Sequence, residues 1–299
     1  MLKENTKILI TGCGGMLGEG IYFFFKDKCK IFPTDIDLNE TWLRELDVRK
    51  IQDVKKIVEE IKPDYIFHLA ALTDLEFCEL NPEESYRTNA LATENIARLC
   101  KEKNITMIYI STAGIFDGKQ EWYNDYDFPN PLNIYSKSKY AGELAVQRIL
   151  DKYFIFRPGW MMGGGPKKDK KFVNKIIKQI KEGKKEIFAI PEIFGTPTYT
   201  HNFAKNIFKI IDLDEYGLYN LVCNGSCSRY DVTQEILKLM RKDKEIKLTK
   251  VHSDFFKKDY FALRPQSEKL INLKLNLKKL NIMRNWKECL KDYIERDFK

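Results

Sequence analysis

The chain has 299 residues, of which 43% are hydrophobic and 13% aromatic, so it can bury a large core and is not a disordered protein. Its 51 lysines and arginines exceed its 43 aspartates and glutamates, for a formal net charge of +8. Basic and acidic residues alternate along most segments, which argues against a nucleic-acid-binding arm. One basic cluster, residues 167–171, could attract a smaller anion such as pyrophosphate, although a solvated surface is the simpler interpretation.

The compartment follows from features that the sequence lacks. No apolar run reaches the ~18 residues of a membrane-spanning helix, and the first residues do not resemble a signal peptide. The 7 cysteines are odd in number and scattered, as expected of free thiols in a reducing compartment. Cys223 and Cys227 have no second pair of ligands at metal-binding spacing. We therefore expect a cytoplasmic protein with no structural metal and no membrane or nucleic-acid partner.

Short apolar runs alternate with helical patterns from the first residues onward. Residues 7–11, 30–34 and 65–70 are typical of buried strands, and residues 16–25 and 51–61 have helical periodicity. The order is strand, helix, strand, helix, strand, which predicts a parallel sheet with helices packed on it.

The same alternation continues in the next hundred residues. We predict a helix over 82–103, a strand over 106–111, a helix over 135–150 and a strand over 153–157. The fold class is therefore α/β, a Rossmann-type doubly wound parallel sheet.

After residue 157 the pattern becomes less regular, and glycines and prolines are frequent. We expect one lobe over residues 1–157 and a smaller C-terminal lobe over 158–299, with some later segments crossing back to the first lobe. The cleft between two such lobes is the natural place for a ligand.

A glycine-rich turn follows the first predicted strand, with Gly12, Gly15 and Gly18 in the spacing G-x-x-G-x-x-G. Such a turn lets the backbone approach a pyrophosphate, and the amides of Met16 and Leu17 at the helix start can bind it. The glycine spacing alone also fits a plain turn between strand and helix. Its position between a strand and a helix favours a dinucleotide-binding site.

An acidic residue at the end of the second strand supports this interpretation. Asp35 could accept hydrogen bonds from the ribose hydroxyls of the adenosine and would repel a 2′-phosphate, a mild preference for NADH over NADPH. Asp37 is a competing candidate, and either acid could be a surface turn residue. Asp47 and Val48 are candidates for lining the adenine pocket.

Tyr135 and Lys139 are four residues apart and hence lie on one face of a predicted helix. An ammonium beside a phenol lowers the pKa of the phenol and makes it a better acid for a carbonyl oxygen. Ser111 and Thr112 end the preceding strand and offer hydroxyls to the same oxygen. The spacing is common by chance, but the upstream nucleotide turn favours the catalytic interpretation. His68, at the end of an apolar strand, is better explained as a structural imidazole.

Further segments carry a resemblance to a known family. They are His68-Leu69-Ala70-Ala71-Leu72-Thr73, Asn89-Ala90, Ser111-Thr112, Phe116-Asp117-Gly118, Asn130-Pro131-Leu132-Asn133-Ile134-Tyr135, Arg157 with Trp160, Phe172-Val173, Gly195-Thr196-Pro197-Thr198-Tyr199, Gly217-Leu218-Tyr219-Asn220 and Arg264-Pro265-Gln266-Ser267. Over nearly its whole length the chain resembles the dTDP-4-dehydrorhamnose reductase family of the extended short-chain dehydrogenase/reductase superfamily.

The resemblance implies a set of roles that spacing alone does not. Thr112, Tyr135 and Lys139 would be the catalytic residues, and Ala70 and Ala71 would contact the cofactor together with the residues named above. Tyr135 and Lys139 would contact the cofactor as well.

On the substrate side, the resemblance implies contacts from Thr73, Trp160 and Arg264. An indole can stack on a sugar and a guanidinium can bind phosphate oxygens, although a core aromatic is the alternative for Trp160.

One departure concerns the wall of the substrate site. The family usually has Asp-Tyr after the Ser-Thr pair, whereas this chain has Ala113-Gly114. Because a carboxylate and a phenol are missing there, the accepted sugar should differ.

The resemblance implies a reductase that uses NADH or NADPH to reduce the C4 ketone of a nucleotide-linked 4-keto-6-deoxy sugar, in deoxysugar or polysaccharide biosynthesis. Two alternatives stay open: a sugar-nucleotide epimerase of the same superfamily, and a non-catalytic regulatory subunit that binds NAD(P). A homodimer is one option for its assembly.

Overall fold

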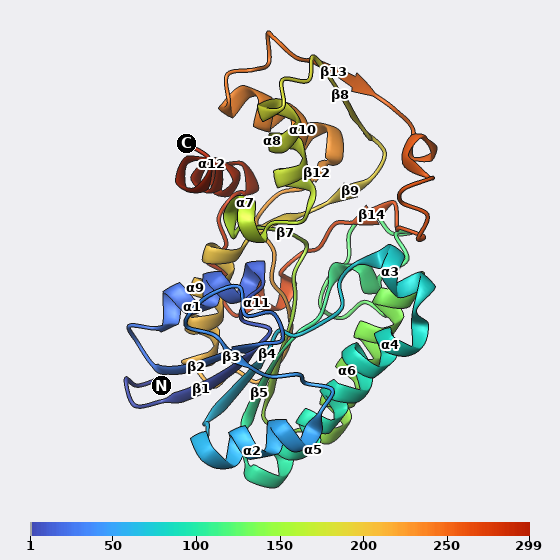
Figure 1. Cartoon of the computed structure of the whole chain (residues 1–299). Coiled ribbons are helices and arrows are strands. Elements are labelled where there is room, and N and C mark those ends of the chain that lie inside the picture. Colours follow the sequence, from blue (N-terminus) through green and yellow to red (C-terminus); the bar gives the residue numbers. More distant parts are fainter. Residues whose placement is uncertain (1) are drawn as a thin grey trace.

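The computed structural model describes residues 2–299 and centres on a parallel sheet of seven strands in the order β11-β6-β5-β4-β1-β2-β3 (Figure 1). The strands are β1 (Lys7–Thr11), β2 (Lys30–Asp35), β3 (Arg44–Glu45), β4 (Tyr65–His68), β5 (Thr106–Ile110), β6 (Tyr153–Arg157) and β11 (Gly217–Asn220). The predicted Rossmann-type sheet is confirmed, because every pairing in it is parallel.

Both faces of this sheet are covered by helices, so the central strands are apolar at successive positions. In β1, Ile8 and Ile10 face one core cluster and Leu9 faces the other. The first cluster contains side chains of α1 (Met16–Phe25) and α9 (Thr200–Ile211). The second contains side chains of α2 (Ile51–Ile61), α5 (Ala92–Lys103) and α6 (Ile134–Ile149).

The helix predicted over 82–103 exists but is not uniform. It consists of α4 (Pro82–Tyr86), a π-helical turn over Arg87–Leu91 and α5. A separate short helix, α3 (Leu75–Leu80), precedes it. The sequence analysis did not foresee the π turn or α3.

The strands of residues 158–299 outside the main sheet are short, and β8, β9, β12 and β13 lie in the upper part of Figure 1. These strands are β7 (Trp160–Met162), β8 (Glu186–Ala189), β9 (Phe194–Gly195), β10 (Pro197–Tyr199), β12 (Cys227–Ser228), β13 (Lys247–Lys250) and β14 (Ser267–Glu268). The helices of residues 158–299, apart from α9, are α7 (Gly165–Lys168), α8 (Phe172–Lys181), α10 (Arg229–Leu239), α11 (Leu273–Leu277) and α12 (Trp286–Asp297), with a 3₁₀ turn over Ser253–Phe256.

Segments that come after residue 158 contribute a strand to the main sheet and a helix to the layer that packs on it. The strand β11 pairs with β6 in parallel, and α9 packs beside α1. No helix among residues 2–299 is both long and apolar enough to cross a membrane.

The strand order places a ligand crevice at a defined point of the sheet. The strand β1 pairs with β2 on one side and with β4 on the other. The helices α1 and α5, which follow β1 and β4, pack on opposite faces of the sheet, so the connections after these two strands separate there. The glycine turn follows β1, and the loop over 69–73 follows β4. These two segments form the floor of the candidate site.

Candidate active site

The three glycines of the turn meet three different structural needs. Gly12 has φ +71, and a Cβ there would lie 2.4 Å from the backbone nitrogen of Ala70. A Cβ on Gly18 would lie 2.3 Å from the carbonyl oxygen of Cys13, so this glycine permits helix α1 to pack on the turn. A Cβ on Gly15 would meet only the Gly12 oxygen, at 3.5 Å. The space above Gly15 is therefore free for a ligand.

Helix α1 begins at this space without a side-chain cap. Gly15 is its N-cap residue, and the first helical hydrogen bond runs from the Glu19 amide to the Gly15 oxygen at 3.0 Å. The amides of Met16, Leu17 and Gly18 precede that bond at the positive end of the helix dipole. This arrangement fits the pyrophosphate of a dinucleotide.

Asp35 lies at the end of β2 directly beside the turn. Its Oδ2 accepts a hydrogen bond from the Gly14 amide at 2.8 Å, and its Oδ1 accepts one from the Asp37 amide at 3.0 Å. Asp37 is exposed, so Asp35 is the acid that is fixed at the turn. Asn39 also reaches the turn, because its amide donates to the Gly14 oxygen at 3.2 Å.

The remaining predicted cofactor residues lie around the same crevice. Ala70 and Ala71 follow β4 and are half-buried. Val48 is buried in the core. Asp47 accepts two hydrogen bonds at 2.8 Å from the guanidinium of Arg49, which holds the pKa of the Asp47 carboxyl below its usual range. The carboxylate of Asp47 is thus already paired within the chain.

Tyr135 and Lys139 stand one turn apart on α6, and both point away from the exposed Lys137. Burial raises the pKa of Tyr135 to about 12, and the nearby hydroxyl of Thr112 opposes that rise. Thr112 is the N-cap of the 3₁₀ turn over Ala113–Ile115 and accepts from the Gly114 amide at 3.2 Å. The predicted threonine therefore lies beside the predicted tyrosine.

Lys139 is 3% exposed, and its Nζ lies 4.2 Å from the centre of the Tyr109 ring. Burial lowers the pKa of Lys139 to about 7, and the carboxylate of Glu143, one turn further along α6, opposes the change. Glu143 is itself fully buried in an ion pair with Arg157 at the end of β6. This pair ties the catalytic helix to the sheet.

His68 has a structural role, as the sequence analysis expected. It is completely buried, and its Nδ1 lies 2.8 Å from the Thr11 hydroxyl and its Nε2 3.1 Å from the Thr93 hydroxyl. Because Thr93 donates its own proton to the Asn89 oxygen, Nε2 must carry the imidazole proton. Burial lowers the pKa of His68 to about 3, so the ring is neutral.

Asn89 is a positioning residue that the prediction did not assign. It lies in the π-helical turn, and its side chain bonds both the amide and the oxygen of Leu72, at 2.9 Å and 3.0 Å. It also donates to the Ser138 hydroxyl at 3.0 Å. Asn89 thereby joins the loop after β4 to the catalytic helix. Only the Asn89-Ala90 pair could have pointed to this residue in the sequence, because the π-helical turn that positions it has no recognisable pattern.

The three predicted substrate residues are spread along the cleft. The oxygen atoms of Thr73 lie 3.0 Å and 3.4 Å from the Nζ of Lys171, in the basic cluster 167–171. The guanidinium of Arg264 donates to Glu76 at 2.8 Å.

Trp160 packs against Gly195, and the guanidinium of Arg229 stacks 3.6 Å from its ring centre. One face of the indole is therefore covered by the chain itself. The Nε1 of Trp160 donates to Glu268 at 2.5 Å. Arg229 and Glu268 were not among the predicted site residues, because each is a single charged residue without a spaced partner.

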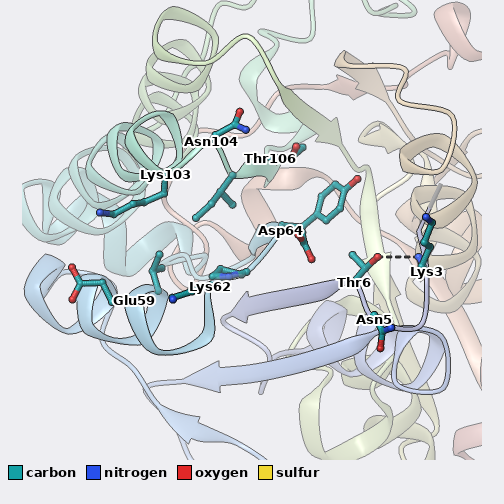
Figure 2. A pocket seen from close by; sticks show the side chains of 13 residues that line it. Lys3, Asn5, Thr6, Glu59, Lys62, Asp64, Lys103, Asn104 and Thr106 are labelled. Atoms are coloured by element: carbon teal, nitrogen blue, oxygen red, sulfur yellow. Dashed lines mark hydrogen bonds between the residues drawn. The ribbon is translucent and has the colours of Figure 1, made fainter.

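A broad hollow lies at the opposite edge of the sheet, near the amino ends of β1, β4 and β5 (Figure 2). Its lining mixes charges of both signs, including Lys62, Asp64, Lys103 and Glu59. None of the predicted site residues lines it. The candidate active site is the crevice at the carboxyl ends of the strands.

Comparisons with known proteins agree with this geometry. The sequence pattern of the family described as RmlD substrate binding domain matches residues 6–298. A crystal structure of dTDP-4-dehydrorhamnose reductase from Clostridium acetobutylicum is 34% identical, with a TM-score of 0.88 over 97% of this chain and 99% of that chain.

Two further relatives are similar over nearly the full length. The dTDP-4-dehydrorhamnose reductase from Bacillus anthracis, solved in complex with NADP, is 31% identical with a TM-score of 0.89 and covers 97% of this chain and 99% of that one. The spore coat polysaccharide biosynthesis protein SpsK of Bacillus subtilis is 25% identical over 293 residues, 97% of each sequence.

Proposed function

The chain belongs to the RmlD substrate-binding-domain family, and we propose that it reduces the C4 ketone of a nucleotide-linked 4-keto-6-deoxy sugar with NAD(P)H, in deoxysugar or polysaccharide biosynthesis. The observation that carries this proposal is the placement of Tyr135 and the buried Lys139 one turn apart on α6, with Thr112 beside Tyr135. A regulatory subunit that only binds its ligand has no chemical need for this arrangement.

The reaction needs a hydride at C4 and a proton at the carbonyl oxygen. The nicotinamide supplies the hydride when it is bound. Tyr135 donates the proton, and the hydroxyl of Thr112 donates a hydrogen bond to the same oxygen. The phenolate left on Tyr135 is stabilised by the ammonium of Lys139 and regains its proton from water. The product carries a C4 hydroxyl.

The proposed cofactor site extends from the glycine turn to the catalytic helix. Its residues are Gly12, Gly15, Met16, Leu17, Gly18, Asp35, Asp47, Val48, Ala70, Ala71, Tyr135 and Lys139. The free space above Gly15 and the amides at the start of α1 support it. We further propose that residues 1–157 form the cofactor lobe and 158–299 mainly the substrate lobe, with Thr73, Trp160 and Arg264 facing the sugar nucleotide.

We propose a mild preference for NADH, because the carboxylate of Asp35 is fixed at the turn where a 2′-phosphate would meet its charge. Asp35→Ala should then raise the affinity for NADPH by about 10-fold and lower that for NADH by about 3-fold or more, because the ribose hydroxyls lose their acceptor. Fluorescence titration of both reduced cofactors measures this. If wild-type protein already binds NADPH much more tightly, Asp35 does not select the cofactor.

The function is tested by oxidation of NADH and NADPH with dTDP-, GDP-, UDP- and CDP-linked 4-keto-6-deoxy sugars. Stoichiometric loss of reduced cofactor with one member of the panel supports the reductase. An epimerase would convert its sugar without net oxidation of cofactor, and a regulatory subunit would bind cofactor without converting any sugar. Cytoplasmic location and a homodimer remain predictions.

A further inference from the structure

Gly114 leaves an opening in the wall of the active site, and three polar atoms meet there. A Cβ built on Gly114 would lie 2.9 Å from the Oγ of Ser136, 3.3 Å from the Oε1 of Glu268 and 3.5 Å from the Oγ1 of Thr112. Any larger side chain at position 114 would displace at least one of them. The Glu268 carboxylate and the Thr112 hydroxyl, which is proposed to bind the ketone, therefore border the same opening.

Glu268 is held in this position by its neighbours. It lies on β14, which pairs with β9, so its backbone is fixed by a sheet. Its Oε2 accepts the hydrogen bond from Trp160 Nε1 at 2.5 Å. Burial raises the pKa of the Glu268 carboxyl, and the hydrogen bond from Trp160 and the guanidinium of Arg229, stacked on Trp160, oppose that rise.

The second carboxylate oxygen of Glu268 has no such partner. No hydrogen bond to Oε1 occurs among residues 2–299, and the side chain is half-buried, so Oε1 is open to water or to a ligand. The Oγ of Ser136, across the opening, is buried and without a partner in the described chain. An acceptor such as Oε1 needs a hydrogen-bond donor, which water supplies in the free protein. A bound ligand can supply one.

We propose that Glu268 Oε1 accepts a hydrogen bond from the C3 hydroxyl of the keto sugar and thereby selects substrates that carry a donor at C3. The inference rests on the proposed function, because it takes the C4 ketone as bound by Thr112 and Tyr135.

The assignment to C3 follows from the chemistry of the sugar. In a 4-keto-6-deoxy hexose, two ring carbons flank the ketone. C5 carries a methyl group and the ring oxygen, neither of which can donate a hydrogen bond. C3 carries the only donor next to the ketone. A carboxylate that borders the same opening as the ketone-binding hydroxyl can thus reach the C3 hydroxyl and no other donor adjacent to C4.

A site built around a hydrogen bond rejects an analogue that lacks the donor, because the bound analogue displaces water from the acceptor and leaves it unpaired. We expect wild-type protein to favour the 3-hydroxyl substrate over its 3-deoxy counterpart by ~30-fold or more in kcat/KM. Glu268→Ala should reduce this ratio to about 3-fold or less. Glu268→Gln keeps the volume and one acceptor, so its ratio should lie between the two.

The experiment measures kcat/KM for the nucleotide-linked 4-keto-6-deoxyhexose that wild type accepts in the panel and for its 3-deoxy counterpart, with thermal unfolding of each variant as a check on folding. Glu121→Gln is the matched control, because Glu121 is exposed and pairs with Lys269, the residue next to Glu268. Its ratio should equal that of wild type. Glu268→Gln keeps the test informative if Glu268→Ala does not fold.

Three results would overturn the inference. A wild-type ratio near 1, or a ratio that persists in both Glu268 variants while the ketone is still reduced, would remove Glu268 from substrate selection and leave the proposed reductase intact. If wild-type protein reduces no member of the nucleotide-sugar panel, the proposed function fails and the inference fails with it.

Discussion

At the scale of single residues, the side-chain amine of Lys139 is buried, and burial disfavours its protonated, charged form. Its pKa is lowered to about 7, whereas that of Tyr135 is raised to about 12. As the pH rises past about 7, Lys139 loses its proton long before Tyr135 does. A reaction that needs the ammonium to stabilise the phenolate therefore has to slow in that range.

We predict that kcat/KM is level below about pH 7 and falls about 10-fold for each further pH unit above it. Lys139→Arg keeps a positive charge at all these pH values, so the fall should disappear in the variant even if its absolute rate is lower. A profile of kcat/KM from pH 5.5 to 9 decides the matter. An unchanged descending limb in Lys139→Arg would assign the ionisation to another group.

The individual site residues were accessible to sequence reasoning to different degrees. The glycine turn and the Tyr135–Lys139 spacing are local patterns, and the structure brings Thr112 to Tyr135 from a neighbouring segment. The proximity of Glu268 to Gly114 joins segments more than 150 residues apart, and no spacing rule connects them. The stacking of Arg229 on Trp160 could not be predicted either, because no spacing rule connects these two residues.

At the scale of elements, the turn between β1 and α1 separates a folding requirement from a binding requirement. Gly12→Ala places a Cβ 2.4 Å from backbone at a positive φ, so we predict a loss of about 2 kcal/mol or more in the free energy of unfolding. Gly15→Ala meets only one atom, at 3.5 Å, so stability should stay within about 0.5 kcal/mol.

The same pair of variants tests the cofactor site. Gly15→Ala should weaken the binding of the reduced cofactor by ~10-fold or more, because its methyl group occupies the space proposed for the pyrophosphate. Thermal unfolding and cofactor titration of the two variants measure both effects. Tight cofactor binding by a stable Gly15→Ala protein would contradict the proposed location of the pyrophosphate.

Most strands and long helices of the first 157 residues could be predicted, since buried strands and amphipathic helices have distinct periodicities. The predicted bounds of β1, α1, α2 and β6 agree with the structure. The π turn was missed because it interrupts a helical pattern without changing its apolar residues. The pairing of β11 with β6 could not be predicted from the sequence of β11, because it depends on the rest of the fold.

At the scale of the whole molecule, the later half of the chain completes the sheet that the first half begins. The cluster around Ile8, Ile10 and Phe154 is closed by Phe203 and Ile207 of α9. We therefore predict that residues 1–157 expressed alone will not unfold cooperatively and will bind a hydrophobic dye, because one face of the sheet is left open. Cooperative unfolding of this fragment, followed by circular dichroism, would show that it is independently stable.

The central claim is that Tyr135 supplies the proton for reduction of a sugar ketone. The most direct measurement compares wild type and Tyr135→Phe in NAD(P)H oxidation with the keto sugar that wild type accepts, beside a titration of cofactor binding. The account predicts that Tyr135→Phe loses ~10²-fold or more in turnover and retains cofactor affinity within about 3-fold. Equal turnover in the two proteins would contradict it.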